Sequence, residues 1–206
     1  MYRVNDKLGS LASGIEDPII HHPDKVSRVA VADGLNARRL DAPVKTDRVL
    51  AAVLFTDIVD STRHAVAIGD SRWRNLLDSH DAVARTRIDE HRGRLVKLTG
   101  DGVLAQFDGA ERGIRCAFAL RDAFALLGIE IRAGLHMGEI DLRGDDISGI
   151  AVHIAQRVQR LAKPSEVLVS EVVPRSVEGA GIEFTDLGRH ELRGLPGTWR
   201  LLAVAA

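Results

Sequence analysis

Short apolar runs alternate with longer amphipathic stretches from residue 47 onward. The run at 49–55 is almost wholly apolar and stops at a polar cluster, which is typical of a buried central strand. Two further runs, 95–98 and 103–107, flank the glycine-rich turn at 99–102, and this pattern predicts a β-hairpin. Later strands are expected at 129–140, 166–170, 181–187 and 198–204.

Helical spacing of apolar residues marks the segments between these strands. Residues 60–90 are long, polar and interrupted near Gly69, which predicts one broken helix or two successive helices. Apolar residues recur every three or four positions in 113–127, and another helix is expected at about 149–161. The order β-α-β-β-α-β predicts an α+β fold with a ferredoxin-like core and C-terminal β additions.

The first 46 residues differ from the rest of the chain. Glycines and prolines interrupt short apolar pieces that never settle into a periodic run. The expected organisation is an N-terminal extension or linker at 1–46, followed by one folded domain at 47–206. The adjacent pair His21 and His22 has no third ligand nearby and is assigned no chemistry.

Composition narrows the classes of function. A chain of 206 residues with 45% apolar content supports one good core. The formal net charge is −1 with scattered basic residues, so we expect binding to neither nucleic acid nor a membrane surface. The single cysteine, Cys116, excludes a disulfide framework and a cysteine-rich zinc site, and a buried thiol is expected. No apolar run approaches the roughly 20 residues of a membrane span and no signal-peptide core occurs, so a cytoplasmic location is expected.

Two aspartates mark the candidate chemistry. Asp57 follows the first strand, and Asp101 lies in the hairpin turn. If the hairpin lies beside that strand, both carboxylates project from one end of the sheet, where Mg²⁺ needs only one or two carboxylates plus substrate phosphates. The alternative for each residue is structural, because aspartate also favours helix N-caps and turns.

The helix expected at 149–161 carries a third candidate group. His153 and Arg157 are four residues apart and share a face away from the apolar stripe, so they could meet a ligand. The alternative is an ordinary surface pair.

Together these segments resemble the catalytic domain of class III nucleotidyl cyclases, and especially its actinobacterial members. These enzymes convert a nucleoside triphosphate into a 3′,5′-cyclic monophosphate and pyrophosphate. The resemblance covers about residues 49–204. It rests on 55–58, 97–101, 134–139, 146–157 and 191–197.

The resemblance implies a metal and phosphate site. Asp57 and Asp101, with the carbonyl of Ile58, would bind two divalent cations, Mg²⁺ or Mn²⁺. Ser61 and Thr62 at a helix start would cradle phosphate oxygens.

The same resemblance assigns transition-state and base contacts. Arg157 matches the family's transition-state arginine, and Arg193 is a weaker candidate for a triphosphate contact. Lys97 and Asp146 would contact the base of the nucleotide and determine which base is accepted. A lysine donor and a carboxylate acceptor complement adenine, whereas guanylyl cyclases of this family carry glutamate at the position of Lys97. The implied activity is that of an adenylyl cyclase acting on ATP, as a homodimer with two shared sites.

One position departs from the family pattern. The family has asparagine four residues before its arginine, where this chain has His153. The alternative function is therefore a degenerate cyclase-homology domain that binds nucleotide or partner proteins without turnover. A P-loop enzyme is set aside, because no Gly-x-x-x-x-Gly-Lys-Ser/Thr occurs.

Overall fold

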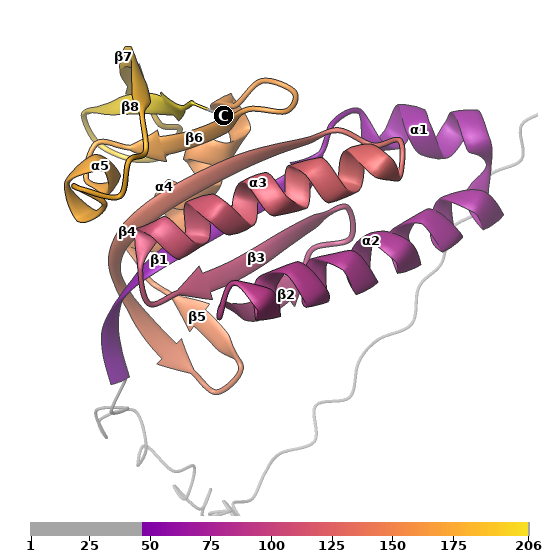
Figure 1. Cartoon of the computed structure of the whole chain (residues 1–206), viewed down its shortest axis with the longest axis horizontal. Helices are drawn as coiled ribbons and strands as arrows, with labels where there is room; N and C mark the ends of the chain where they lie inside the picture. The colour runs from indigo at the N-terminus through magenta and orange to yellow at the C-terminus, as the bar shows by residue number, and fades with distance from the viewer. Residues whose placement is uncertain (1–46, 206) are drawn as a thin grey trace, which may run out of the picture. The chain divides into compact units, whose positions relative to one another are not determined.

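The computed structural model describes residues 47–205, and Figure 1 shows helices lying against a long, twisted sheet. Its elements are, in chain order, β1 (Asp47–Ile58), α1 (Ser61–Ile68), α2 (Asp70–Glu90), β2 (Arg94–Leu98), β3 (Gly102–Phe107), α3 (Ala110–Leu126), β4 (Ile131–Arg143), β5 (Asp146–Ser148), α4 (Ile150–Leu161), β6 (Val167–Ser170), α5 (Val173–Ser176), β7 (Phe184–Glu191) and β8 (Thr198–Val204).

The sheet has the strand order β2-β3-β1-β4-β6-β8-β7, and β5 pairs with β4 outside this path. Within the four-strand segment β2-β3-β1-β4, each adjacent pair is antiparallel, whereas β4 and β6 are parallel. Together with their helices they form the split β-α-β arrangement of a ferredoxin-like core. The predicted α+β fold with C-terminal β additions is confirmed.

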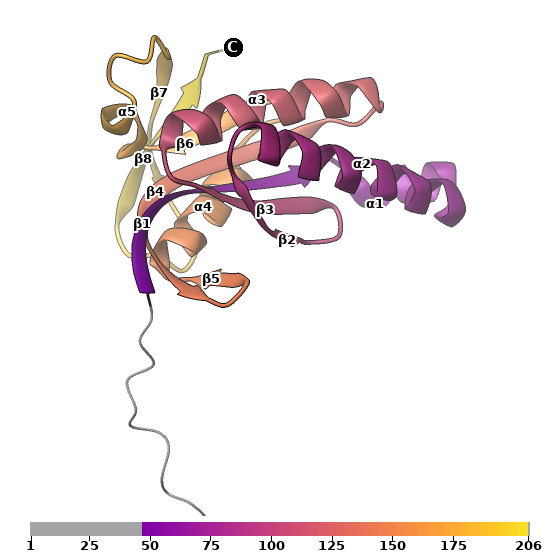
Figure 2. The same cartoon turned by 60° about the horizontal axis from the view of Figure 1, so that its bottom comes forward.

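Helices cover both faces of the central strand, β1. Alternate residues of a strand point to opposite faces. Leu54 therefore belongs to the core under α2 and α3, and Val53 to the core under α4. Figure 2 shows α4 on the opposite side of the sheet from α2 and α3. Both faces of β1 are buried from Ala51 to Thr56, which explains the apolar sequence of this part of the strand.

Helix α4 approaches the sheet closely because β4 has no side chain at Gly134. A Cβ at this position would overlap the backbone N and Cα of Gln159. Helix α4 also has small side chains on its buried face, those of Ala151 and Ala155. The distance between α4 and β4 is therefore set by backbone contact.

The predicted helices match the structure closely, and the two predicted strands of the hairpin occur as β2 and β3. Gly69 separates α1 from α2, with φ of 81° that favours glycine. The short elements β5 and α5 were not predicted. The strand predicted at 181–187 was placed too early, because β7 continues beyond Asp186, which pairs with Arg200 of β8.

Two further expectations concern burial and membranes. Cys116 is fully buried, as predicted, and burial raises the pKa of its thiol to about 12. Among residues 47–205, no helix is long and apolar enough to cross a membrane. The expected extension at 1–46 lies outside the described residues.

Candidate active site

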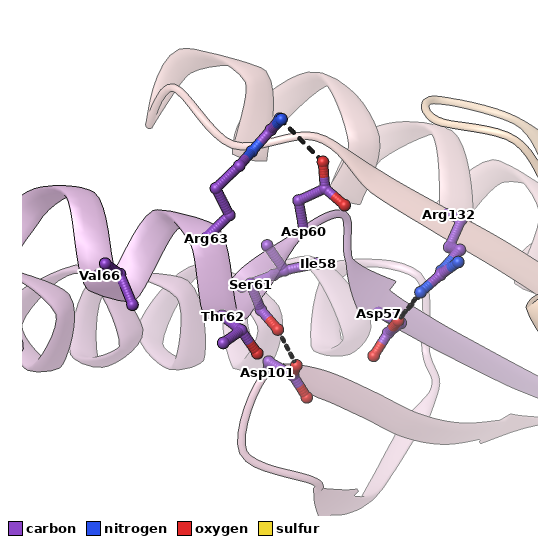
Figure 3. Close-up of a pocket in the computed structure, with 9 residues that line it drawn as sticks. All are labelled: Asp57, Ile58, Asp60, Ser61, Thr62, Arg63, Val66, Asp101 and Arg132. Carbon is purple, nitrogen blue, oxygen red and sulfur yellow. Dashed lines mark hydrogen bonds and ion pairs between the residues drawn. The ribbon is translucent and has the colours of Figure 1, made fainter.

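An open cavity of about 600 Å³ lies where β1 ends and α1 begins. Figure 3 shows the side chains around it. The residues that line it come from β1, α1, the β2–β3 turn and β4. They are Asp57, Ile58, Asp60, Ser61, Thr62, Arg63, Val66, Asp101 and Arg132.

Asp57 and Asp101 reach this cavity from neighbouring strands. Asp57 lies opposite Gly102 in the β1–β3 ladder, and the Ile58 amide donates to the Asp101 carbonyl over 2.9 Å. A Cβ at Gly102 would overlap the Thr56 carbonyl oxygen, so glycine permits this close approach. The hairpin therefore lies beside the first strand, and both carboxylates line one cavity.

The start of α1 adds hydroxyl and amide groups. The Ser61 hydroxyl donates to Oδ2 of Asp101, and Thr62 also lines the cavity. The N-cap of α1 is Asp60, in the left-handed region at φ 52°, and its side chain makes no capping hydrogen bond. Asp57 is therefore not the N-cap of this helix. The free amides of the first turn begin beside the two carboxylates.

Arg132 is a site residue that the sequence analysis missed. Its Nε and Nη2 donate to Oδ2 of Asp57 over 3.0 and 2.7 Å, and Figure 3 shows the guanidinium aimed at this carboxylate. Asp57 and Arg132 are directly opposite each other in the β1–β4 ladder. Arg132 lies two residues before Gly134 and therefore on the same face of β4. This alternation of side chains along the predicted strand is the sequence signal that could have identified Arg132.

Arg63 and Val66 of α1 were also missed. Arg63 forms an ion pair with Asp60 at 2.8 Å, and both side chains are largely exposed. Val66 is 80% exposed although it is apolar. Its exposure shows that this edge of the cavity is open in the single chain.

Lys97 and Asp146 lie on two elements that contact each other. Both are exposed, on β2 and β5 respectively. Arg94 of β2 donates to the carbonyl of Gly144, in the turn that leads to β5. The Asp146 carboxylate accepts the Ile147 amide over 2.8 Å, which holds it near the backbone. Neither Lys97 nor Asp146 lines the cavity.

Helix α4 carries the remaining predicted group. His153 is exposed, and Arg157 is half-buried. Nε of Arg157 donates to the Arg193 carbonyl over 2.9 Å, and Nη1 donates to the Gln156 amide oxygen over 3.1 Å. The structure thus brings Arg157 and the β7–β8 connection together, as a second group away from the cavity.

The predicted site residues therefore divide into two sets within one chain. Asp57, Ile58, Ser61, Thr62 and Asp101 line the cavity. Five other predicted site residues are not among the residues that line it within 47–205, namely Lys97, Asp146, His153, Arg157 and Arg193.

The cavity's donor set suits a hard divalent cation. Three carboxylates line it, those of Asp57, Asp60 and Asp101, and carboxylate, hydroxyl and carbonyl oxygens are the ligands that Mg²⁺ and Mn²⁺ prefer. No cluster of three or more His, Cys, Asp or Glu with metal-binding geometry occurs within residues 47–205. A cation held by one or two carboxylates and completed by substrate phosphates fits such a site.

The sequence matches a known family over most of its length. Residues 44–203 match the profile of the "Adenylate and Guanylate cyclase catalytic domain".

Relatives among curated proteins include "Putative adenylate cyclase 3" of Rhizobium meliloti, 33% identical over 157 residues. This match covers 72% of the chain and 27% of the relative. An uncharacterised protein of Mycobacterium tuberculosis is 31% identical over 175 residues, covering 82% of the chain and 59% of the relative. The chain thus spans less than two thirds of the length of either relative.

Solved structures share the fold. The adenylyl cyclase CyaB of P. aeruginosa superposes with a TM-score of 0.73 at 20% identity, covering 79% of this chain and 97% of CyaB. An adenylate/guanylate cyclase/hydrolase of Silicibacter pomeroyi superposes with a TM-score of 0.70 at 27% identity, covering 78% of this chain and 99% of the other. The catalytic core of a rhodopsin-guanylyl cyclase with converted specificity, in complex with ATPαS, superposes with a TM-score of 0.73 at 20% identity. This match covers 79% of this chain and 99% of the other.

Proposed function

The chain belongs to the adenylate and guanylate cyclase catalytic domain family, and on this premise we propose that it is an adenylyl cyclase. It converts ATP into 3′,5′-cyclic AMP and pyrophosphate. The observation that carries the proposal is the cavity that Asp57 and Asp101 share with the start of α1. ATP as the substrate implies that the domain works in the cytoplasm.

Asp57 and Asp101, with the carbonyl of Ile58, would hold two divalent cations, Mg²⁺ or Mn²⁺. When bound, two such cations activate the attacking hydroxyl and stabilise the leaving oxygen in an in-line displacement. The chain's own part is to fix the two carboxylates. β1 sets the position of Asp57, and the Ser61 hydroxyl orients the carboxylate of Asp101.

The start of α1 is suited to a triphosphate. Its first-turn amides have no partners within the helix, and the helix dipole favours negative charge there. Ser61 and Thr62 lie at this end and line the cavity. We assign them phosphate contacts.

We assign Arg157 to stabilisation of the negative charge that develops in the transition state. Its planar guanidinium stays charged and donates along fixed directions. Removal of one such donor typically costs about 3–4 kcal/mol of barrier. Arg193, whose carbonyl accepts from Arg157, supplies a weaker contact to the triphosphate.

We assign base selection to Lys97 and Asp146. Adenine presents an acceptor at N1 and a donor at its amino group, which a lysine donor and a carboxylate acceptor complement. Both side chains are exposed and lie on adjoining elements, so one base can meet both. Guanine presents the reverse pattern at these positions, and the proposed substrate is therefore ATP.

We infer that the working unit is a homodimer with two equivalent sites. Lys97, Asp146 and Arg157 do not line the cavity of their own chain. A second copy can bring its own set to that cavity, and two-fold symmetry then completes both sites at once. The exposed Val66 at the cavity edge agrees with contact by a partner.

A second candidate function is nucleotide or partner binding without turnover. Two observations favour it: His153 replaces the asparagine of the family, and Asp57 is paired with Arg132. A domain of this kind keeps the fold and the nucleotide contacts but does not complete the chemistry.

An assay of cyclic nucleotide production tests the proposal. The purified chain is supplied with ATP or GTP and with Mg²⁺ or Mn²⁺, and we expect cyclic AMP from ATP. Asp101→Ala should abolish the product. Asp108→Ala is the matched control, because Asp108 forms a surface ion pair with Arg112 and lies outside the cavity lining, so this variant should keep its activity. If no product forms from either nucleotide while the chain is folded and dimeric, the proposed activity is refuted and the result favours the second candidate function.

A further inference from the structure

The ion pair between Asp57 and Arg132 occupies a carboxylate that the proposed function assigns to a cation. Both donor nitrogens of Arg132 bind the same oxygen, Oδ2. The side chains are 28% and 35% exposed, so the pair is partly shielded from water. The β1–β4 ladder holds the two residues opposite each other. The contact is therefore built into the sheet.

The other two carboxylates of the cavity are less constrained. Asp101 accepts from a neutral hydroxyl, that of Ser61. Asp60 pairs with Arg63, but these side chains are 52% and 80% exposed, where solvent weakens the attraction. Among the three, Asp57 alone has a partly buried positive partner.

A guanidinium and a divalent cation compete for the same carboxylate oxygens. The cavity holds three carboxylates and two guanidiniums, a formal charge of −1. Two divalent cations alone would make it strongly positive. A nucleoside triphosphate, with a charge of about −4, would offset them. The charges of the cavity therefore favour cations and triphosphate together over cations alone.

We propose that Arg132 acts as an internal counter-ion of Asp57, which weakens divalent-cation binding to the nucleotide-free chain and makes it depend on nucleotide. The inference rests on the proposed function, since it concerns the cation ligands of that same site. It assigns a role to a residue that the sequence motifs did not include.

Mn²⁺ binding to the purified, nucleotide-free chain tests this role, measured by the electron paramagnetic resonance signal of free Mn²⁺. Arg132→Gln removes the charge and should tighten Mn²⁺ binding by about tenfold, the equivalent of losing one charge-assisted hydrogen bond. Asp57→Asn should abolish this tightening when combined with Arg132→Gln. Arg63→Gln is the matched control, since it removes a guanidinium from the same cavity without touching Asp57, and should change the affinity by less than about twofold.

Two results would overturn the inference. In the first, the Mn²⁺ affinity of Arg132→Gln equals that of the unmodified chain. In the second, Arg63→Gln tightens binding as much as Arg132→Gln does, which would make the effect one of general charge. Circular dichroism checks the folding of each variant. If Arg132→Gln does not fold, Arg132→Lys keeps the charge but loses the two-nitrogen contact, and it should tighten binding by about threefold.

A second arm measures the coupling to nucleotide. With 3′-deoxy-ATP, which lacks the attacking hydroxyl, the unmodified chain should bind Mn²⁺ more tightly than without nucleotide. Coupling between two ligands is reciprocal, so Mn²⁺ should strengthen nucleotide binding by the same factor. Arg132→Gln should reduce this factor, and an unchanged factor would contradict the inference.

These measurements need no turnover, so they separate this inference from the proposed function. A chain that binds Mn²⁺ as predicted but makes no cyclic nucleotide would refute the proposed activity alone. A chain that makes cyclic AMP, but whose Mn²⁺ affinity ignores Arg132, would refute the counter-ion role alone.

Discussion

Individual side chains carry the proposed specificity of this domain, and most of them are exposed. Lys97, Asp146 and His153 lie on the surface of the single chain, where substitution leaves the core untouched. Surface substitutions away from packed or capped positions usually change stability by less than about 0.5 kcal/mol. Changes in activity at these positions therefore report on function.

Base preference should follow the donors and acceptors at Lys97 and Asp146. Lys97→Glu combined with Asp146→Asn offers an acceptor and a donor that match guanine. We expect the ratio of ATP to GTP turnover to shift toward GTP by at least about tenfold, because a mismatched charged hydrogen bond costs roughly 1.5–3 kcal/mol. Lys163→Glu makes the same charge change at an exposed position outside the cavity and should leave the ratio unaltered. An unchanged ratio in the double variant would refute the assignment.

His153 should limit turnover. Asparagine at this position presents a compact amide that can both donate and accept a hydrogen bond, whereas the imidazole of histidine is bulkier. We expect His153→Asn to raise kcat by about tenfold, because a side chain of the right size can orient the substrate more precisely. His91→Asn, at the C-cap of α2, is the matched control. A fall in kcat would instead identify the histidine as an adapted ligand.

A buried histidine should make stability depend on pH. His136 is 5% exposed, shares a hydrogen bond with Ser170 over 2.7 Å, and burial lowers its pKa to about 4. As the pH falls, His136 therefore takes up a proton near pH 6.5 in the unfolded chain but only near pH 4 in the folded chain. Stability is unaffected by this group above pH 6.5. It should fall by roughly 3 kcal/mol as the pH drops to about 4.

Urea unfolding across this pH range measures the effect. His136→Gln keeps a hydrogen-bonding group next to Ser170 but cannot titrate, so its stability should vary less with pH than that of the unmodified chain. The difference between the two curves isolates His136 from the carboxylates that titrate in the same range. Parallel curves would mean that His136 titrates alike in the folded and unfolded chain.

At the scale of elements, the packing of α4 on β4 positions Arg157. Ala151, Ala155 and Val158 bury one face of the helix, and Gly134 lets the backbones meet. Leu192 packs in the core cluster of Ile154 and Val158, which holds the β7–β8 connection against α4. The Arg193 carbonyl can then hold Arg157 in place. The position of this arginine thus depends on the backbone contact between Gly134 and Gln159, which lies two residues after Arg157 in α4.

Gly134→Ala should disturb this arrangement. Its Cβ would overlap the backbone of Gln159, and overpacking of this kind typically costs about 1–3 kcal/mol. We expect reduced stability in urea unfolding, and reduced kcat even where the variant is fully folded, because α4 and Arg157 are displaced. Gly109→Ala is the control, since Gly109 is extended and, within residues 47–205, a Cβ there would meet no non-neighbouring residue within 4 Å. Full activity of folded Gly134→Ala would show that Arg157 tolerates the displacement.

At the scale of the whole molecule, the division of site residues between two sets predicts complementation. Asp101→Ala damages the cavity set, and Arg157→Ala damages the set outside it. When equal amounts of the two variants pair at random, half of the dimers are heterodimers. Each heterodimer has one intact site and one defective site. The mixture should therefore recover about one quarter of the unmodified activity.

A mixture of Asp101→Ala with Asp57→Ala is the matched control. Both changes damage the cavity set, so every pairing leaves each cavity defective and no activity should return. If the first mixture also fails while heterodimers are present, the site lies within one chain and the proposed dimer is wrong.

The sequence by itself determined the longer elements and the residues of the motifs. Apolar periodicity is local, so β1, the β2–β3 hairpin, α3 and α4 could be located within a few residues. Short β5 could not, because a three-residue strand exists only through its pairing with β4. The bounds of β7 likewise depend on its partner β8.

Only the tertiary structure decided which side chains meet. Asp57 and Arg132 are 75 residues apart, and the register of β1 and β4 brings them together. Register depends on the whole ladder and on the packing of both faces, which no local pattern encodes. The same holds for the division of the site, since Arg157 is carried by α4, which packs on the sheet, and is not among the residues that line the cavity. Local sequence thus specifies the chemical groups, and long-range packing decides which of them can act together.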